Sequence, residues 1–197
     1  MVITVASFKG GVGKTTTAIH LAAYLHTRGP ALLVDGDVNR SALKWAEAGH
    51  LPFPVADERG SAKLIRQAEH VIFDTQARPS RDDLRELAKG CDLLVIPATP
   101  DALSLRALFL TVDELRAIQA DSFRILLTIC PPAPSRAADE AREAWTDDGL
   151  PLFKGQIRRF VAFQKAALEG ATVDAVRDEH AADGWDDYLA IGREMTR

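Results

Sequence analysis

The sequence predicts an α/β fold in which a mostly parallel, twisted sheet is covered by helices on both faces. Strand-like apolar runs recur along the chain, helical patterns lie between them, and the runs are continuously apolar rather than alternating. Strands that alternate with helices favour a parallel sheet, and strands buried on both faces need apolar side chains on both. The expected strands are residues 2–6, 31–34, 70–73, 92–96 and 123–129.

The helical patterns are recognised by apolar residues three and four positions apart. The first covers residues 14–28, where Ala18, Leu21 and Leu25 share one face. Gly29 follows it and is typical of a helix end. Further helices are expected at residues 81–89, 102–120, 136–145, 160–168 and 178–196, with a loop at 131–134 and a short strand around 152–157.

Length and composition favour one globular domain. The chain has 197 residues, no repeat and no Pro/Gly/Ser-rich linker, so we expect a single domain over residues 1–197. Its net charge of -4 argues against a uniformly basic nucleic-acid binder but leaves a local basic patch open. Cys91 and Cys130 have no metal-ligand spacing, so neither a zinc ribbon nor a disulfide framework is indicated. With no targeting pattern and no apolar span, the expected location is the cytoplasm.

A glycine-rich loop follows the first strand and opens the first helix. Residues 7–16 read S-F-K-G-G-V-G-K-T-T, which matches G-x-x-x-x-G-K-[ST] apart from the residue at its first position. In such a loop the glycines let backbone amides wrap around phosphate oxygens, and the helix N-terminus favours the negative charge. Lys14 is expected to reach the β- and γ-phosphates, and the Thr15 hydroxyl to bind Mg²⁺. The nucleotide-binding set is Lys9, Gly10, Gly11, Val12, Gly13, Lys14, Thr15 and Thr16.

The early lysine makes this loop resemble the deviant Walker A motif of the ParA/MinD ATPases, within the P-loop NTPase fold. The resemblance implies that Lys9 reaches across an ATP-bound homodimer to the partner's phosphates. A cation delivered by the second subunit ties dimerisation to the γ-phosphate and helps to stabilise charge in the transition state. The other interpretation of Lys9 is a solvated loop residue.

Two further segments resemble the same family. Asp35 and Asp37 end the second strand, as in the family's D-x-D switch, and Asp74 ends the third, as in its Walker B strand. The resemblance implies that Asp35 and Asp74 support the Mg²⁺ shell together with Thr15. Asp37 is expected to position the attacking water, so that Lys9, Lys14 and Asp37 form the catalytic set. The chain departs from the family pattern at residues 38–39, which are Val-Asn rather than Pro-Gln, and at Gln76.

The resemblance covers essentially the whole chain and implies slow ATP hydrolysis that a ParB-like or other adaptor stimulates. The loop starts so near residue 1 that we expect no N-terminal helix-turn-helix domain. Pro131 and Pro132 follow the strand at 123–129, and either form an apolar wall for adenine or simply stiffen a connecting loop. The same region lacks the Asn/Thr-Lys-x-Asp motif of GTP-binding proteins, which argues against GTP.

Nonspecific double-stranded DNA is the expected partner of the ATP dimer, which would place the chain on the nucleoid. Residues 150–168 carry four cations and no acid. Doubled in a dimer, such a patch would hold phosphate backbones in a salt-sensitive way. A solvated helix face is the alternative. The candidate DNA-binding residues are Lys154, Arg158, Arg159 and Lys165.

Several functions remain open beside plasmid or chromosome partition. The same ATPase could position a protein cargo such as carboxysomes, and nothing in the chain identifies the cargo. A MinD-like membrane-cycling ATPase would carry a basic amphipathic tail, whereas residues 186–197 are mixed in charge, so stable membrane association is not expected. A cluster-bridging reductase would need cysteines in a glycine-rich loop, which Cys91 and Cys130 are not. A purely binding module would need an inactive loop, yet Lys14 and Thr15 are present.

Overall fold

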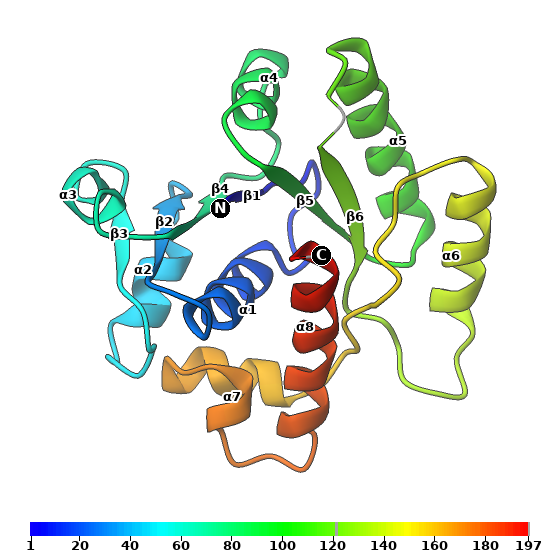
Figure 1. Cartoon of the computed structure of the whole chain (residues 1–197). Helices are drawn as coiled ribbons and strands as arrows, with labels where there is room; N and C mark the ends of the chain where they lie inside the picture. Colours follow the sequence, from blue (N-terminus) through cyan, green and yellow to red (C-terminus); the bar gives the residue numbers. More distant parts are fainter. Residues whose placement is uncertain (121, 197) are drawn as a thin grey trace.

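The computed structural model describes residues 1–120 and 122–196 and is built around a six-stranded parallel sheet (Figure 1). Each neighbouring pair in this sheet is parallel, and the order is β3-β2-β4-β1-β5-β6. The predicted fold class is therefore confirmed. The strands are β1 (Val2–Val5), β2 (Ala31–Gly36), β3 (Val55–Asp57), β4 (His70–Thr75), β5 (Leu93–Ala98) and β6 (Phe123–Leu127).

Helices cover both faces of the sheet, as the continuous apolar strands require (Figure 1). One face carries α1 (Lys14–His26), α2 (Ser41–Ala46), α7 (Ala162–Glu169) and α8 (Ala181–Met195). The other carries α3 (Ser61–Ile65), α4 (Arg81–Lys89) and α5 (Ala102–Ala117). Helix α6 (Ala137–Asp147) lies beyond the β6 edge, and the 3-10 turn η1 (Val173–Ala175) lies between α7 and α8.

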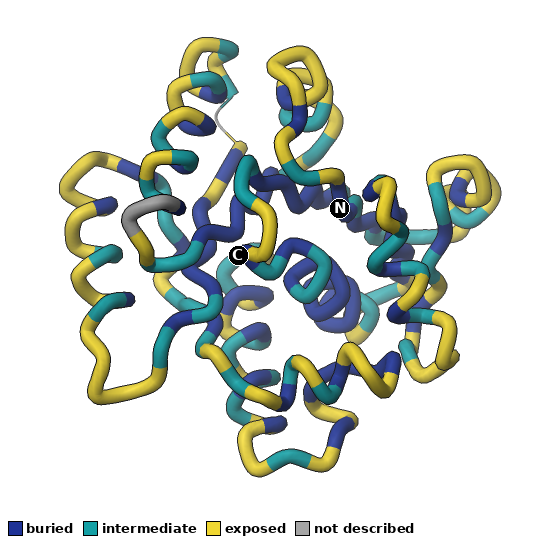
Figure 2. The backbone as a smooth tube through the Cα atoms, turned by 180° about the vertical axis from the view of Figure 1, so that it is seen from behind, coloured by how far each residue is buried: buried dark blue, intermediate teal, exposed yellow. Residues whose placement is uncertain are grey.

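Helix α1 is the centre of the packing. Figure 2 shows it almost entirely buried between the sheet and the C-terminal helices. Ile19, Leu21 and Leu25 have no exposed surface, and neither does the polar His20. A helix that is apolar nearly all round must be covered on every side, so α8 is needed to cover the side of α1 turned away from the sheet.

The strand register brings the predicted site residues together. Asp35 of β2 lies opposite Asp74 of β4, and Val5 of β1 lies opposite Asp74 on the other side. The carboxyl ends of three neighbouring strands therefore meet where the glycine-rich loop leaves β1. In open α/β sheets this edge is where ligands bind.

The expected strand around residues 152–157 is wrong. Isolated bridges and a few backbone hydrogen bonds join this segment to the sheet, with bridges between Leu152 and Ile125 and between Arg158 and Cys130, but the segment does not form a strand. Pro151 and Gly155 lie within or beside it, and both residue types weaken strands. Four short elements, α2, α3, β3 and η1, were not expected, because pieces of three to six residues show too little periodicity. Over the described residues, no helix has both the length and the hydropathy to cross a bilayer.

Candidate nucleotide-binding site

The glycine-rich loop leaves open space beside its glycines. Gly11 and Gly13 have φ values of 77° and 81°, which side chains of L-residues rarely tolerate. A Cβ atom built on Gly10, Gly11 or Gly13 would meet no heavy atom within 4 Å. Helix α1 begins directly after the loop, and its first amides have no partner within the helix. The loop therefore fits a phosphate chain.

Lys14 and Thr15 are the first two residues of helix α1. The motif predicts that Lys14 binds phosphate and that Thr15 binds Mg²⁺. Lys14 is buried, with 9% exposure, at the helix N-terminus beside the open loop. The Thr15 hydroxyl donates a hydrogen bond of 2.7 Å to Oδ2 of Asp74. Strand register and helix start together bring a hydroxyl and a carboxylate that are 59 positions apart into direct contact.

Asp74 is a buried carboxylate with one oxygen unsatisfied. Its side chain has no exposed surface, and Oδ1 has no hydrogen-bond partner among the described residues. Burial raises the pKa of Asp74 to about 7, against the hydrogen bond from Thr15 and the charge of Lys14. Asp35 and Asp37 raise this pKa further. A buried, orphaned carboxylate oxygen beside a hydroxyl suits a hard cation with oxygen ligands, so Thr15 and Asp74 fit Mg²⁺.

Asp35 organises the loop that follows β2. Its Oδ1 accepts a hydrogen bond from the amide of Asp37 at 3.0 Å, and its Oδ2 accepts one from the amide of Leu43 at 2.9 Å. Asp37 accepts in turn from the amide and the side chain of Asn39, at 2.8 and 3.0 Å. Asn39 is one of the departures from the family pattern, and here it fixes the Asp37 carboxylate. Val38 between them is 77% exposed.

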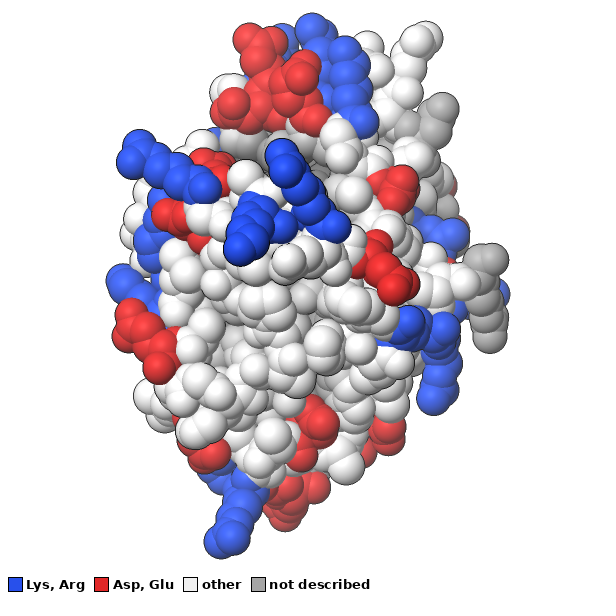
Figure 3. Space-filling view, turned by 60° about the vertical axis from the view of Figure 1, so that its left-hand side comes forward, with Lys and Arg blue, Asp and Glu red and all other residues white. Residues whose placement is uncertain are grey.

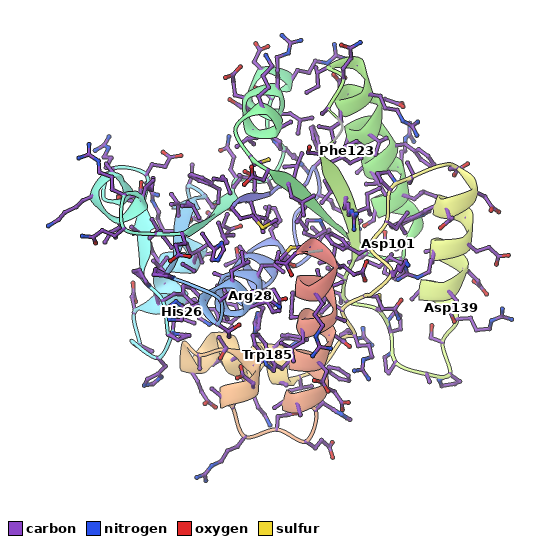
Figure 4. The ribbon with its side chains drawn as sticks, viewed as in Figure 1. His26, Arg28, Asp101, Phe123, Asp139 and Trp185 are labelled. Carbon is purple, nitrogen blue, oxygen red and sulfur yellow. The ribbon has the colours of Figure 1, made fainter. Side chains whose placement is uncertain are left out.

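Lys9 is held by its own chain. Its Nζ lies 2.9 and 3.0 Å from the two carboxylate oxygens of Asp101 and 2.8 Å from the Ser104 hydroxyl. Figure 4 labels Asp101 in the segment that joins β5 to α5. Partial burial opposes ionisation of Asp101, but hydrogen bonds from Thr99, Ser104 and Lys9 together hold its pKa well below the usual range. No sequence pattern indicated this contact, which joins residues 92 positions apart.

A cavity of about 280 Å³ opens beside the loop, on the side of the C-terminal helices. Gly13 and Thr16 line it, so it continues the phosphate site. Pro131 and Pro132 are not among its lining residues, and their adenine-binding role stays a prediction without support from this cavity. The other lining residues are Thr128, Ile129, Ile157, Arg158, Arg159, Phe160, Phe163, Gln164, Ala167 and Tyr188.

Carboxylates from elsewhere in the chain reach two of the four predicted DNA-binding cations. Arg158 is paired with Asp187, and Lys165 lies 2.7 Å from Asp178. The segment 150–168 has no acid of its own, but acids from residue 178 onward fold against it. Lys154 and Arg159 are exposed and form no ion pair with any described residue. On the face drawn in Figure 3, cations stand among acids and do not form one continuous basic patch.

A strand, a glycine-rich loop and a helix, with a buried aspartate at the end of the neighbouring strand, define a P-loop nucleotide-binding protein. The chain belongs to the family described as "CobQ/CobB/MinD/ParA nucleotide binding domain", which matches residues 3–173. This confirms the resemblance to the ParA/MinD ATPases.

Relatives and solved structures agree with this family. The chain is 36% identical over 203 residues to "Maintenance of carboxysome distribution protein A" of Gloeobacter kilaueensis, covering 100% of this chain and 94% of the relative. It is 35% identical over 147 residues to "Protein ParA" of Rhizobium radiobacter, covering 67% and 66%. An ATP complex of Cyanothece McdA superposes with a TM-score of 0.74 over 99% of this chain and 96% of that chain. At 15% identity, that likeness shows the shared fold.

Proposed function

We propose that this chain is an ATPase that dimerises with ATP, binds nonspecific double-stranded DNA on the nucleoid and positions a protein cargo there. An adaptor protein recruits the cargo and stimulates slow hydrolysis of ATP to ADP and phosphate. The observation that carries the proposal is the 36% identity with a carboxysome distribution protein over the whole of this chain.

Plasmid or chromosome partition is the second candidate. It is supported by the 35% identity with a protein named ParA, over two thirds of the chain. Both functions use the same nucleotide cycle and differ in the adaptor. Isolating the partner that raises ATP turnover would separate them, because a partition adaptor binds a specific DNA site and a cargo adaptor binds a protein body.

The proposed reaction assigns a separate task to each residue of the site. The loop amides and Lys14 hold the β- and γ-phosphates, while Asp37, fixed by Asn39, orients the attacking water. Thr15 and Asp74 would hold Mg²⁺, which neutralises charge on the phosphates when bound. Asp35 keeps the switch loop in place through two backbone amides.

Dimerisation requires Lys9 to change partners. In the free chain its ammonium is held by Asp101 and Ser104. To stabilise the γ-phosphate bound by a second subunit, the Lys9 ammonium must leave Asp101 and Ser104. The negative charge of the phosphate then takes the place of the Asp101 carboxylate as its partner. Because ADP lacks the γ-phosphate, ATP favours this exchange and ADP does not.

DNA binding is proposed to rest on Lys154 and Arg159, the two predicted cations without an ion-pair partner among the described residues. Two cations on each subunit give four in a dimer, so binding should be weak in the monomer and strongly dependent on salt. Stable membrane association is not part of the proposal.

The test is retention of nonspecific duplex DNA with ATP, with ADP and without nucleotide, across a salt series. We expect binding with ATP only, falling steeply as salt rises. Lys14→Ala is the matched control and should not bind in any state. ATP hydrolysis by the unaltered chain without DNA binding in any state would contradict the nucleoid-based function and leave the ATPase assignment intact.

A further inference from the structure

Arg158 lies in the wall of the cavity beside the phosphate-binding loop. The cavity runs from Gly13 and Thr16 to the segment after α6 and to helices α7 and α8. A ligand whose phosphates occupy the loop would extend its base into this space. With a volume of about 280 Å³, the cavity suits one purine ring system with part of a sugar.

The guanidinium of Arg158 is fixed along one edge. Its Nε donates to both carboxylate oxygens of Asp187 at 3.1 Å, and its Nη2 donates to Oδ1 of Asp187 at 2.9 Å. Nη2 also donates to the backbone carbonyl of Asp183 at 3.1 Å. The amide of Arg158 donates to Asp187 as well, at 2.9 Å. A bidentate pair of this kind sets the plane of the guanidinium as well as its position.

The fixed guanidinium belongs to a layered stack. Its Cζ lies 4.9 Å from the centre of the Phe160 ring. The Phe160 ring is stacked on His180, with ring centres 4.8 Å apart and an angle of 19° between the planes. The Arg158 side chain is still 38% exposed and lines the cavity, so a further planar group can lie against it there.

We propose that the purine base of the bound nucleotide stacks on the Arg158 guanidinium, and that Asp187 is the positioning residue that holds this plane in the cavity wall. The inference rests on ATP as the ligand of the phosphate-binding loop and adds how its base is held. Flat guanidinium groups stack on aromatic rings, and a purine offers a larger face than a pyrimidine. Arg158 is then a nucleotide-binding residue and not a DNA-binding one.

Helix α8 offers a matched control for Asp187. Asp186 is its neighbour, is exposed, and makes no hydrogen bond to a described residue through its side chain. Asp187→Asn and Asp186→Asn remove the same charge from the same helix. Only Asp187→Asn removes the bidentate contact to Arg158. Comparing the two variants therefore distinguishes the effect of the guanidinium position on ATP affinity from the effect of losing one negative charge on α8.

The experiment measures the affinities of both variants for ATP, for CTP and for ribose 5-triphosphate, which lacks a base. We expect Asp187→Asn to weaken ATP binding about tenfold, in the range of one lost stacking contact. Ribose 5-triphosphate binding and all affinities of Asp186→Asn should stay within about twofold of the unaltered chain. The preference for ATP over CTP should shrink in Asp187→Asn alone.

Two results would overturn the inference: an unchanged ATP affinity in Asp187→Asn, or an equal loss of affinity for ATP and for ribose 5-triphosphate. If Asp187→Asn fails to fold, Arg158→Lys replaces it, because lysine keeps the positive charge but lacks the planar guanidinium. The same ratio of affinities for ATP and ribose 5-triphosphate then decides the outcome. An unaltered chain that binds neither ATP nor ribose 5-triphosphate contradicts the nucleotide site itself. That outcome is distinct from an unaltered chain that binds both equally, which contradicts base stacking.

Discussion

The two sides of the nucleotide site are built in different ways. The phosphate side consists of the loop at residues 9–16, which begins four residues after β1, and of Asp35, Asp37 and Asp74, which lie at the carboxyl ends of β2 and β4. The proposed base side is the cavity beside the loop, which is lined by Gly13 and Thr16 and by residues between 128 and 188. Sheet register assembles the first side, whereas helix packing around α1 assembles the second.

The difference shows what each side depends on. The phosphate side needs particular backbone angles and a few polar atoms, so its residues leave a motif in the sequence. The base side needs shape and stacking, which many side chains can supply, and its contacts join distant segments. Figure 4 shows Trp185 of α8, which lies within 6.5 Å of the His20 ring of α1. Substitutions on the phosphate side should abolish ATP binding. Substitutions on the base side should weaken ATP binding or lower the stability of the fold.

The largest effect is expected for Lys14→Ala on the phosphate side. Removing a buried ammonium that faces a polyphosphate should lower ATP affinity by about 100-fold or more. Isothermal titration calorimetry with ATP measures it, and Lys44→Ala, an exposed lysine on α2, is the control that should bind normally. ATP affinity within about fivefold of the unaltered chain would mean that the loop does not supply most of the binding free energy.

The second prediction is that the stability of the fold falls at low pH, because His20 on the base side is buried in its neutral form. Its ring is fully buried, accepts a hydrogen bond at Nε2 from the Val173 amide at 3.0 Å and stacks on Tyr188. Burial lowers the pKa of His20 to about 4, against the hydrogen bond to the Thr16 carbonyl.

Since the unfolded chain binds a proton near pH 6.5 and the folded chain only near pH 4, stability is full above pH 6.5 and is lost as the pH falls. The free energy of unfolding should drop by about 3 kcal/mol across this window. Urea unfolding at several pH values measures the drop, and His20→Gln should lack this share of it. An identical pH dependence in both chains would mean that His20 is not held neutral.

A third prediction separates DNA binding from both sides of the site. Lys154→Glu with Arg159→Glu should weaken ATP-dependent DNA retention about tenfold and lower the slope of its salt dependence by about 2 per subunit. ATP affinity should change little in Lys154→Glu alone, because Arg159 lines the cavity beside the loop and Lys154 does not. Lys165→Glu is the comparison variant, because Lys165 is already paired with Asp178. If Lys165→Glu weakens DNA binding as strongly as the double change, the DNA contact lies along α7.

The smallest effect is expected for Asp101→Asn, which weakens the contact that holds Lys9 in the free chain. The Lys9 and Asp101 side chains are 34% and 44% exposed, and ion pairs of that exposure contribute under about 1 kcal/mol. ATP-dependent dimerisation should therefore tighten by up to about fivefold in analytical ultracentrifugation. Asp113→Asn, an exposed aspartate on α5, should leave it unchanged. Weaker dimerisation in Asp101→Asn alone would mean that Asp101 supports the dimer instead.

Sequence reasoning predicted the sheet and the phosphate side because both follow from local rules. Apolar runs marked five of the six strands, and the P-loop motif placed Lys14 and Thr15 at a helix start, as observed. The β3 strand was missed because three residues carry no usable period. The partners of Arg158 were missed because charge was counted along the chain, whereas Asp187 reaches it from 29 positions away.

We expect ATP, bound on the phosphate side, to switch the chain from monomer to dimer. Light scattering of the Asp37→Ala variant with ATP and with ADP tests it most directly, since that variant should bind ATP without turning it over. We expect the mass of one chain, 21.5 kDa, with ADP and twice that mass with ATP. A mass of 21.5 kDa in both states, with ATP shown to be bound, would contradict the switch.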